Sequence, residues 1–236
     1  MDYKRILAAR ENRKTRFERP FSNFFETFKQ CISAGEAVLD GSAPSGFSLL
    51  LERTAVISTV TAIEVYYRDM FDFILRSCEP EFFEPKLQSL HPEKYDIMDL
   101  LAVYDHQIHP LELVSASQSF QNVERIERVF SKFLKKGMWS SVLSLQIRRK
   151  DDPDSVATWT ADDLSGLKDT FTLRHQLVHD PANTAFINAD TIKKLWQSSH
   201  MVFGSDFVLG QMLTDNSVLP KAGNLESEQD VHGNTH

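Results

Sequence analysis

The chain of 236 residues contains few cysteines, glycines and prolines, and each scarcity excludes a class of protein. Its two cysteines, Cys31 and Cys78, form no CxxC pair, which excludes a zinc ribbon, a thioredoxin-like site and a disulfide framework. We expect both thiols to act as small buried hydrophobic groups. Nine glycines and nine prolines are too few for a collagen-like chain or for one that is wholly disordered.

Long apolar runs and the common catalytic motifs are also missing. No segment reaches about 18 uninterrupted apolar residues, so we expect no membrane-spanning helix. The first twenty residues lack the apolar stretch of a secretory signal, which favours a cytoplasmic protein. The sequence contains no GxxxxGKS/T, GxGxxG, HExxH or GxSxG segment. His106 and His109 have no third clustered ligand beside them, and we predict neither a metal site nor a cofactor.

The net charge of −7 is unevenly distributed along the chain. An acidic protein gains no general attraction to nucleic acid, because phosphate contacts depend on Lys and Arg. Residues 1–19 and 121–150 are nonetheless basic, with seven Lys/Arg against three acids and eight against two. Such a block is either a solvated helix face or a local RNA-binding surface. The RNA-binding candidates in the second block are Arg125, Arg128, Lys132 and Lys136.

Apolar residues recur at helical spacing through nearly the whole chain, without strand-like alternation. The longest such segment, from Phe47 to about Cys78, is apolar around most of its circumference, which predicts a central helix packed on several sides. We therefore expect an all-α fold, a helical bundle around a long central helix. The other predicted helices span 22–39, 93–104, 117–136, 160–179 and 190–213. A capping box at Thr160–Asp163 begins the helix predicted over 160–179.

Composition changes divide the chain into three parts. The turn-forming segment 40–46 separates an N-terminal helical extension, 1–46, from the bundle, 47–214. Residues 215–236 are polar and aperiodic, which predicts a disordered tail.

Residues 174–180 hold the densest group of chemically active side chains. Arg174 supplies a permanent planar cation suited to phosphate, while His175 and His179 exchange protons near neutral pH. All three precede Pro181 at a predicted helix end, where a ligand has access. A structural role remains open, because a histidine near a helix C-terminus also stabilises the helix dipole. Two histidines four residues apart are at most a partial metal site.

The segment Arg174-His175-x-x-x-His179 resembles the R-x4-6-H signature of the HEPN superfamily, a group of all-α domains that includes many ribonucleases. An earlier segment, 61–71, is similar to the long helix of several HEPN groups, in which Glu64 interrupts an apolar run ahead of an aromatic residue and Arg68. The resemblance covers about residues 47–214, and the order of helices agrees with it. Residues 1–40 show no such similarity.

The resemblance implies a metal-independent endoribonuclease of a defence or toxin-type system, in which the ribose 2′-OH attacks the neighbouring phosphate. His179 would be the general acid/base, Arg174 would hold the phosphate, and His175 would orient the two. Glu64 is a further candidate, although it also has the spacing of an i, i+4 ion pair with Arg68. The family implies a homodimer and a possible antitoxin or regulatory partner protein. The alternative is a non-catalytic helical module that binds nucleotides or proteins.

Overall fold

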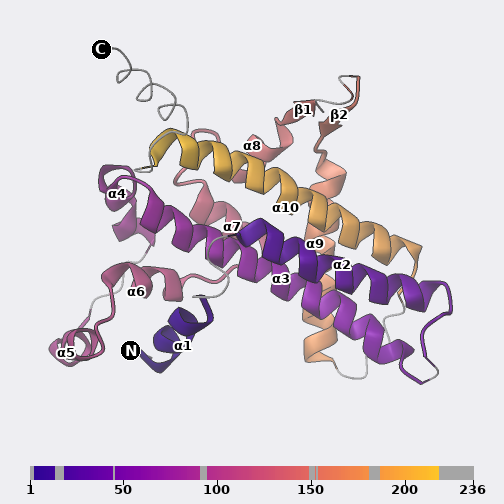
Figure 1. Ribbon diagram of the computed structural model, residues 1–236, viewed down its shortest axis with the longest axis horizontal. Coiled ribbons are helices and arrows are strands. Elements are labelled where there is room, and N and C mark those ends of the chain that lie inside the picture. The colour runs from indigo at the N-terminus through magenta and orange to yellow at the C-terminus, as the bar shows by residue number, and fades with distance from the viewer. Residues whose placement is uncertain are drawn as a thin grey trace, which may run out of the picture.

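The computed structural model describes residues 3–13, 19–44, 46–90, 95–148, 152, 154–180 and 187–217, and every structural statement refers to these residues. They form a mostly helical fold with one small antiparallel hairpin, so the all-α expectation is confirmed (Figure 1). The elements in chain order are α1 (Tyr3–Arg13), α2 (Pro20–Leu39), α3 (Ser48–Ser77), α4 (Pro80–Leu90), α5 (Ile97–Asp105), α6 (Pro110–Ser117), α7 (Val123–Phe130), α8 (Met138–Leu143), β1 (Gln146–Arg148), β2 (Val156–Thr158), α9 (Ala161–His179) and α10 (Ala189–Asn216).

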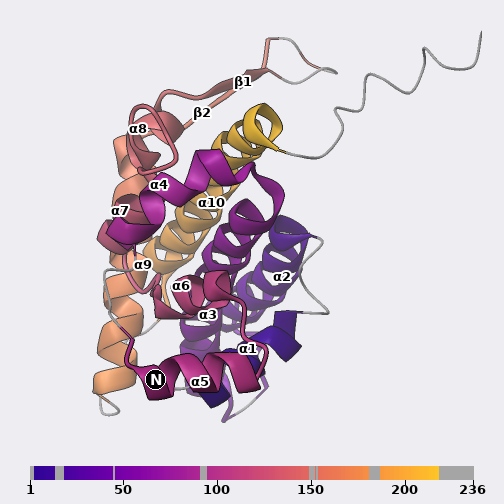
Figure 2. The same cartoon turned by 90° about the vertical axis from the view of Figure 1, so that its left-hand side faces the viewer.

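Helix α3 forms the centre of the bundle, as its apolar circumference predicts. It lies between α2 and α9, and α10 packs against all three (Figures 1 and 2). Polar side chains also join the long helices. The Tyr67 and Ser205 hydroxyls lie 2.7 Å apart in the buried α3–α10 contact, and Tyr66 donates to Asp206 at 3.1 Å. These two contacts fix the position of α3 along α10.

Helix α2 belongs to the same hydrophobic core as the rest of the bundle. Its buried residues Phe24, Phe28 and Ile32 join the core cluster that includes α3 and α10. Gly35 allows a close approach there, because a Cβ at this position would lie 2.8 Å from Ile192 Cδ1. The division of the chain at residue 46 remains a prediction, and residues 218–236 of the expected tail lie outside the described residues.

Helices α4, α6 and α8 lie in segments for which the sequence predicts no helix, and two further details differ from the expectation. The helix predicted over 117–136 is shorter, because α7 ends at Phe130 and the following residues turn with hydrogen bonds of i to i−3 type. Glu127 stabilises this reversal by accepting from Ser131 Oγ at 2.7 Å and from Trp139 N at 2.9 Å. Strands β1 and β2 are three residues each, too short to show alternation in the sequence.

Helices α1, α5 and α6 form a smaller unit beside the bundle. Ile6, Ile108 and Leu113 make a second apolar cluster there, separate from the main core. Tyr3 stacks on His106 with ring centroids 4.4 Å apart. Within the described residues, none of the helices is long and apolar enough to cross a membrane.

Candidate active site at the end of α9

Helix α9 positions the three residues of the R-x4-H segment. It begins with the expected capping box, in which Asp163 N donates to Thr160 Oγ1 at 3.3 Å and Thr160 N donates to Asp163 Oδ2 at 2.8 Å. It remains helical through His179, and the Asp180 N–H still donates to Gln176 O at 2.9 Å. The segment is therefore the last turn and a half of a regular helix.

Arg174 of α9 lies near enough to Glu64, in the middle of α3, for its charge to act on that carboxyl. The charges of Arg174 and Arg68 lower the pKa of Glu64, whereas burial raises it and is the larger effect, so the net pKa is raised. Glu64 Oε1 and Arg174 Nε are both buried, and neither has a hydrogen-bond partner among the residues that the structure describes. The tertiary fold thus places two candidate residues from distant segments of the sequence near each other.

His175 and His179 form a second pair on the exposed part of α9. Their ring centroids lie 4.4 Å apart with an interplanar angle of 49°. Both side chains are exposed, as the helix end predicts. Two adjacent imidazoles accessible to solvent offer both a proton donor and a proton acceptor to a ligand at the helix end.

The two pairs occupy different sides of the helix. Five residues correspond to about 500° of rotation, or 140° net, which separates Arg174 from His179 on a regular helix. The buried Arg174 Nε has no hydrogen-bond partner among the described residues, whereas the His175 and His179 rings contact each other. A ligand that engages both pairs must therefore extend across the end of α9.

The four basic candidates lie on a different element. Arg125 and Arg128 are exposed on α7, whereas Lys132 and Lys136 follow it in the turns of 131–136. The structure joins none of the four to the Glu64–Arg174 pair by a described contact. Lys132 and Lys136 instead line a separate groove beside α4 and the C-terminal part of α10.

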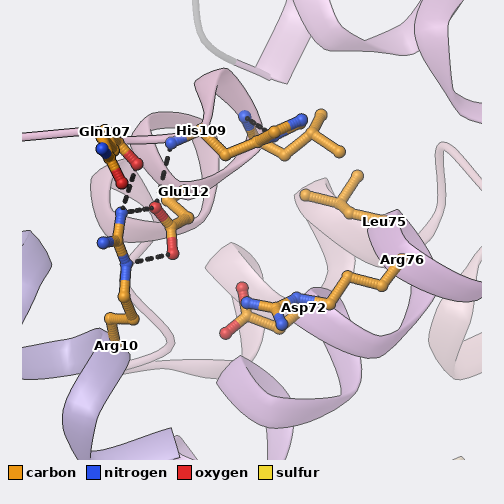
Figure 3. A pocket seen from close by; sticks show the side chains of 8 residues that line it. Arg10, Asp72, Leu75, Arg76, Gln107, His109 and Glu112 are labelled. Atoms are coloured by element: carbon orange, nitrogen blue, oxygen red, sulfur yellow. Dashed lines mark hydrogen bonds and ion pairs between the residues drawn. The ribbon is translucent and has the colours of Figure 1, made fainter. Parts of the chain in front are cut away.

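A polar cavity of about 500 Å³ between α1, α3 and α6 contains charged residues that the sequence analysis missed (Figure 3). Arg10 Nε donates to Glu112 Oε1 at 2.9 Å, and its Nη2 donates to Glu112 Oε2 at 2.5 Å and to Gln107 O at 2.9 Å. The α3 wall contributes Asp72 and Arg76, so the two positive charges are matched by two negative ones. No local signal pairs Arg10 with Glu112, because the pair exists only once α1 has packed on α6.

His109, which lies beside this cavity, has a structural role. Its Nδ1 accepts from Leu111 N at 3.2 Å, and its own N–H donates to Glu112 Oε2 at 3.1 Å. The residue therefore caps α6. The described residues contain no group of three or more His, Cys, Asp or Glu side chains arranged to hold a metal ion.

A second cavity, of about 630 Å³, is mainly aromatic. Phe21 and Phe25 of α2 face Trp196 and Phe203 of α10, and His200 also lines it. Trp196 and Phe203 remain partly exposed, at 45% and 36% of their surface. Apolar cavities with a few polar groups are typical small-molecule sites.

Comparison with known proteins adds no relative, since no family model, curated protein or solved structure matches this chain.

Proposed function

We propose that this protein is a metal-independent endoribonuclease of HEPN type, acting at the end of α9 in a defence or toxin-type system. The observation that carries the proposal is the proximity of Glu64 and Arg174, each with one buried polar atom that has no partner among the described residues. The exposed His175–His179 pair on the same helix end supports it.

The assigned roles follow from charge and position. Arg174 binds the phosphate and stabilises its growing negative charge, as a preorganised donor does best in a partly desolvated site. Glu64 is a positioning residue that keeps the guanidinium near α3 through attraction between opposite charges. His179 transfers protons, and His175, packed against it, fixes its orientation.

The reaction needs no oxidant and no external nucleophile. The 2′-oxygen forms a bond to phosphorus while its proton passes to an imidazole acting as base. The bond from phosphorus to the 5′-oxygen breaks, and that oxygen takes a proton from an acid. The products are a 2′,3′-cyclic phosphate and a 5′-hydroxyl. Because one histidine cannot be both acid and base in the same instant, either His175 or a histidine of a second subunit completes the pair.

Cleavage of RNA by the purified full chain, with and without EDTA, is the direct test. We expect cleavage that EDTA leaves unchanged, with products that end in a cyclic phosphate. Removing the acid/base in His179→Ala should lower the rate by roughly 10²–10⁴, and Arg174→Ala should lower it by about 10²–10³. Gln176→Ala, an exposed position on the same helical turn, is the matched control and should cut normally. Cleavage that EDTA abolishes, or variants that cut like the wild type, would contradict the proposal.

The aromatic cavity between α2 and α10 supports a second candidate, a non-catalytic module that binds a nucleotide or a protein. The two candidates differ in a simple measurement. A binding module leaves RNA intact, and Trp196→Ala, rather than Arg174→Ala, should abolish binding of its ligand.

A further inference from the structure

Helix α5 exposes almost its entire apolar side. None of its residues is buried, and the helix projects from the body of the molecule (Figures 1 and 2). Ile97, Leu100, Leu101 and Tyr104 are 68%, 50%, 47% and 81% exposed. They lie at i, i+3, i+4 and i+7, the spacing of the anchors with which an amphipathic helix fills a groove. Exposed apolar surface of this kind marks an interaction site.

The charges of α5 restrict its partner. Asp96, Asp99 and Asp105 lie in or beside the helix, and residues 95–105 include no Lys or Arg. Helices that lie on anionic membranes carry Lys and Arg on their polar side. An acidic helix with apolar anchors is instead complementary to an apolar groove with a basic rim.

Such a groove exists elsewhere on the same molecule, between α4, the turns that follow α7 and the C-terminal part of α10. It has a volume of about 540 Å³, and its apolar floor includes Phe82 of α4, Phe133, and Met212 of α10. Lys132, Lys135 and Lys136 line it. Lys86 lies beside the groove without lining it, with Nζ 4.1 Å from the Phe82 ring centroid and hydrogen-bonded to Phe82 O. Asp215 is the one acidic residue among the described lining.

We propose that α5 of one molecule docks into the Lys132–Lys136 groove of a second copy of this chain. The groove offers apolar area to the four anchors and positive charge to the three carboxylates. This inference is independent of the ribonuclease proposal, and it gives Lys132 and Lys136 a protein-binding role in place of RNA binding. Arg125 and Arg128 do not line the groove.

The arrangement of the elements favours a reciprocal dimer. In Figure 2, α5 lies along the bottom of the near face, while α4, α7 and α8 lie toward its top. The helix therefore cannot reach the groove of its own chain. A two-fold axis across this face places each α5 opposite the groove of the other copy, so both contacts form together and the assembly closes.

The aromatic cavity between α2 and α10 is a poorer match for α5. Its lining includes one lysine, Lys193, and one acid, Asp163. Lys193 already pairs with Asp162 at 3.3 Å, so the rim has no surplus positive charge for three carboxylates.

Sedimentation velocity of the full chain, without RNA, tests the proposal. The wild type should be a dimer. Leu101→Asp, which changes the helix, and Lys132→Glu/Lys136→Glu, which changes the groove, should each raise the dissociation constant roughly 30-fold or more, as loss of an interface anchor does. The controls are Phe47→Ser, an exposed apolar residue elsewhere, and Arg125→Glu/Arg128→Glu, an equal charge reversal outside the groove. Both should dimerise like the wild type.

Mixing the two defective variants gives a second, independent readout. In the mixed dimer, the unchanged α5 of Lys132→Glu/Lys136→Glu meets the unchanged groove of Leu101→Asp, so one contact is intact. In a dimer of either variant alone, both contacts are damaged. We expect the mixture to associate more tightly than either variant. A monomeric wild type, a dimer unaffected by both variants, or controls that dissociate equally would overturn the proposal. A monomeric wild type would also exclude an active site shared by two subunits, but not cleavage by a site within one chain. Cleavage of RNA is measured separately on the full chain, so the failures of the two proposals can be distinguished.

Discussion

Glu64 of α3 lies within electrostatic reach of Arg174 of α9, whose positive charge lowers the pKa of a carboxyl that burial raises. Within the described part of the chain, neither Glu64 Oε1 nor Arg174 Nε has a hydrogen-bond partner, although both atoms are buried. Buried polar atoms are normally paired, because each unpaired one retains its full cost of desolvation. Each of the two residues therefore has one buried polar atom whose cost of desolvation is not offset by a described hydrogen bond.

Replacing Arg174 should raise the pKa of Glu64 further. The guanidinium favours the charged carboxylate, so Arg174→Ala removes one of the two charges that oppose the effect of burial. A carbon-detected NMR titration of the Glu64 carboxyl measures this directly. Lys168→Ala, an exposed charge on the same helix, is the control. An unchanged titration in Arg174→Ala would mean that the two groups do not interact.

Glu64→Gln should change how stability depends on pH. The pKa of Glu64 is raised in the folded state, so that state binds a proton more tightly than the unfolded chain does. Its contribution to stability is present below the usual glutamate pKa and is lost as pH rises through the raised value. Glu64→Gln should therefore stabilise the protein relative to wild type at pH 7 but not at pH 4.

Urea denaturation at the two pH values provides the measurement, with the exposed Glu36→Gln as control. If Glu64→Gln destabilises the protein at pH 7, attraction to Arg174 and Arg68 outweighs burial, and folding lowers the pKa of Glu64 instead of raising it.

A shared active site predicts complementation between inactive variants. Suppose that the C-terminal ends of α9 from two subunits meet in one cleft. A mixed dimer of Arg174→Ala and His179→Ala then has one intact Arg174, from the His179→Ala chain, and one intact His179, from the Arg174→Ala chain. Mixing the two proteins should restore part of the RNA cleavage that each lacks alone. Activity that remains at the level of the separate variants would show that each site is built within one chain.

The salt dependence of RNA binding tests the surface of α7. Arg125 and Arg128 are exposed on one side of that helix, at i and i+3. If both contact phosphates, Arg125→Ala/Arg128→Ala should reduce the slope of log affinity against log salt by roughly 1.4, about 0.7 for each lost contact with a single strand. Lys4→Ala/Lys29→Ala removes equal charge from α1 and α2 and should leave the slope unchanged. An unaltered slope in the α7 variant would make those arginines a solvated helix face.

Two glycines of α10 should respond in opposite ways to the same substitution. A Cβ at Gly204 would lie 2.6 Å from Trp159 Nε1 and 2.8 Å from Val142 Cγ1, so Gly204→Ala should destabilise the protein by about 1–3 kcal/mol. Gly210 has no atom within 4 Å of an added Cβ, and Gly210→Ala should stabilise the helix by about 0.5–1 kcal/mol. Thermal unfolding of the two variants compares them. If the two variants changed the unfolding temperature equally, the close contact between α10 and Trp159 would not be the reason for a glycine at position 204.

Sequence periodicity predicted the long helices well, because each buries apolar residues at regular spacing. The central helix expected from Phe47 to Cys78 extends over Ser48–Ser77, and the capping box at Thr160 begins α9 as expected. Periodicity did not predict the end of α7, because side-chain contacts there stabilise turns in place of a continued helix. The apolar spacing after Phe130 suits a helix and a series of turns equally, and the contacts of Glu127 with Ser131 and Trp139 favour the turns.

The sequence by itself determined the helical fold and the side chains available for chemistry, including Arg174, His175 and His179, because spacing and residue type are local properties. Only the tertiary structure decided which groups meet. It placed Glu64 beside Arg174, paired Arg10 with Glu112, and left the apolar side of α5 uncovered. Such contacts depend on how separate helices cross, and the crossing is determined by packing over the whole core, which no single segment of sequence encodes.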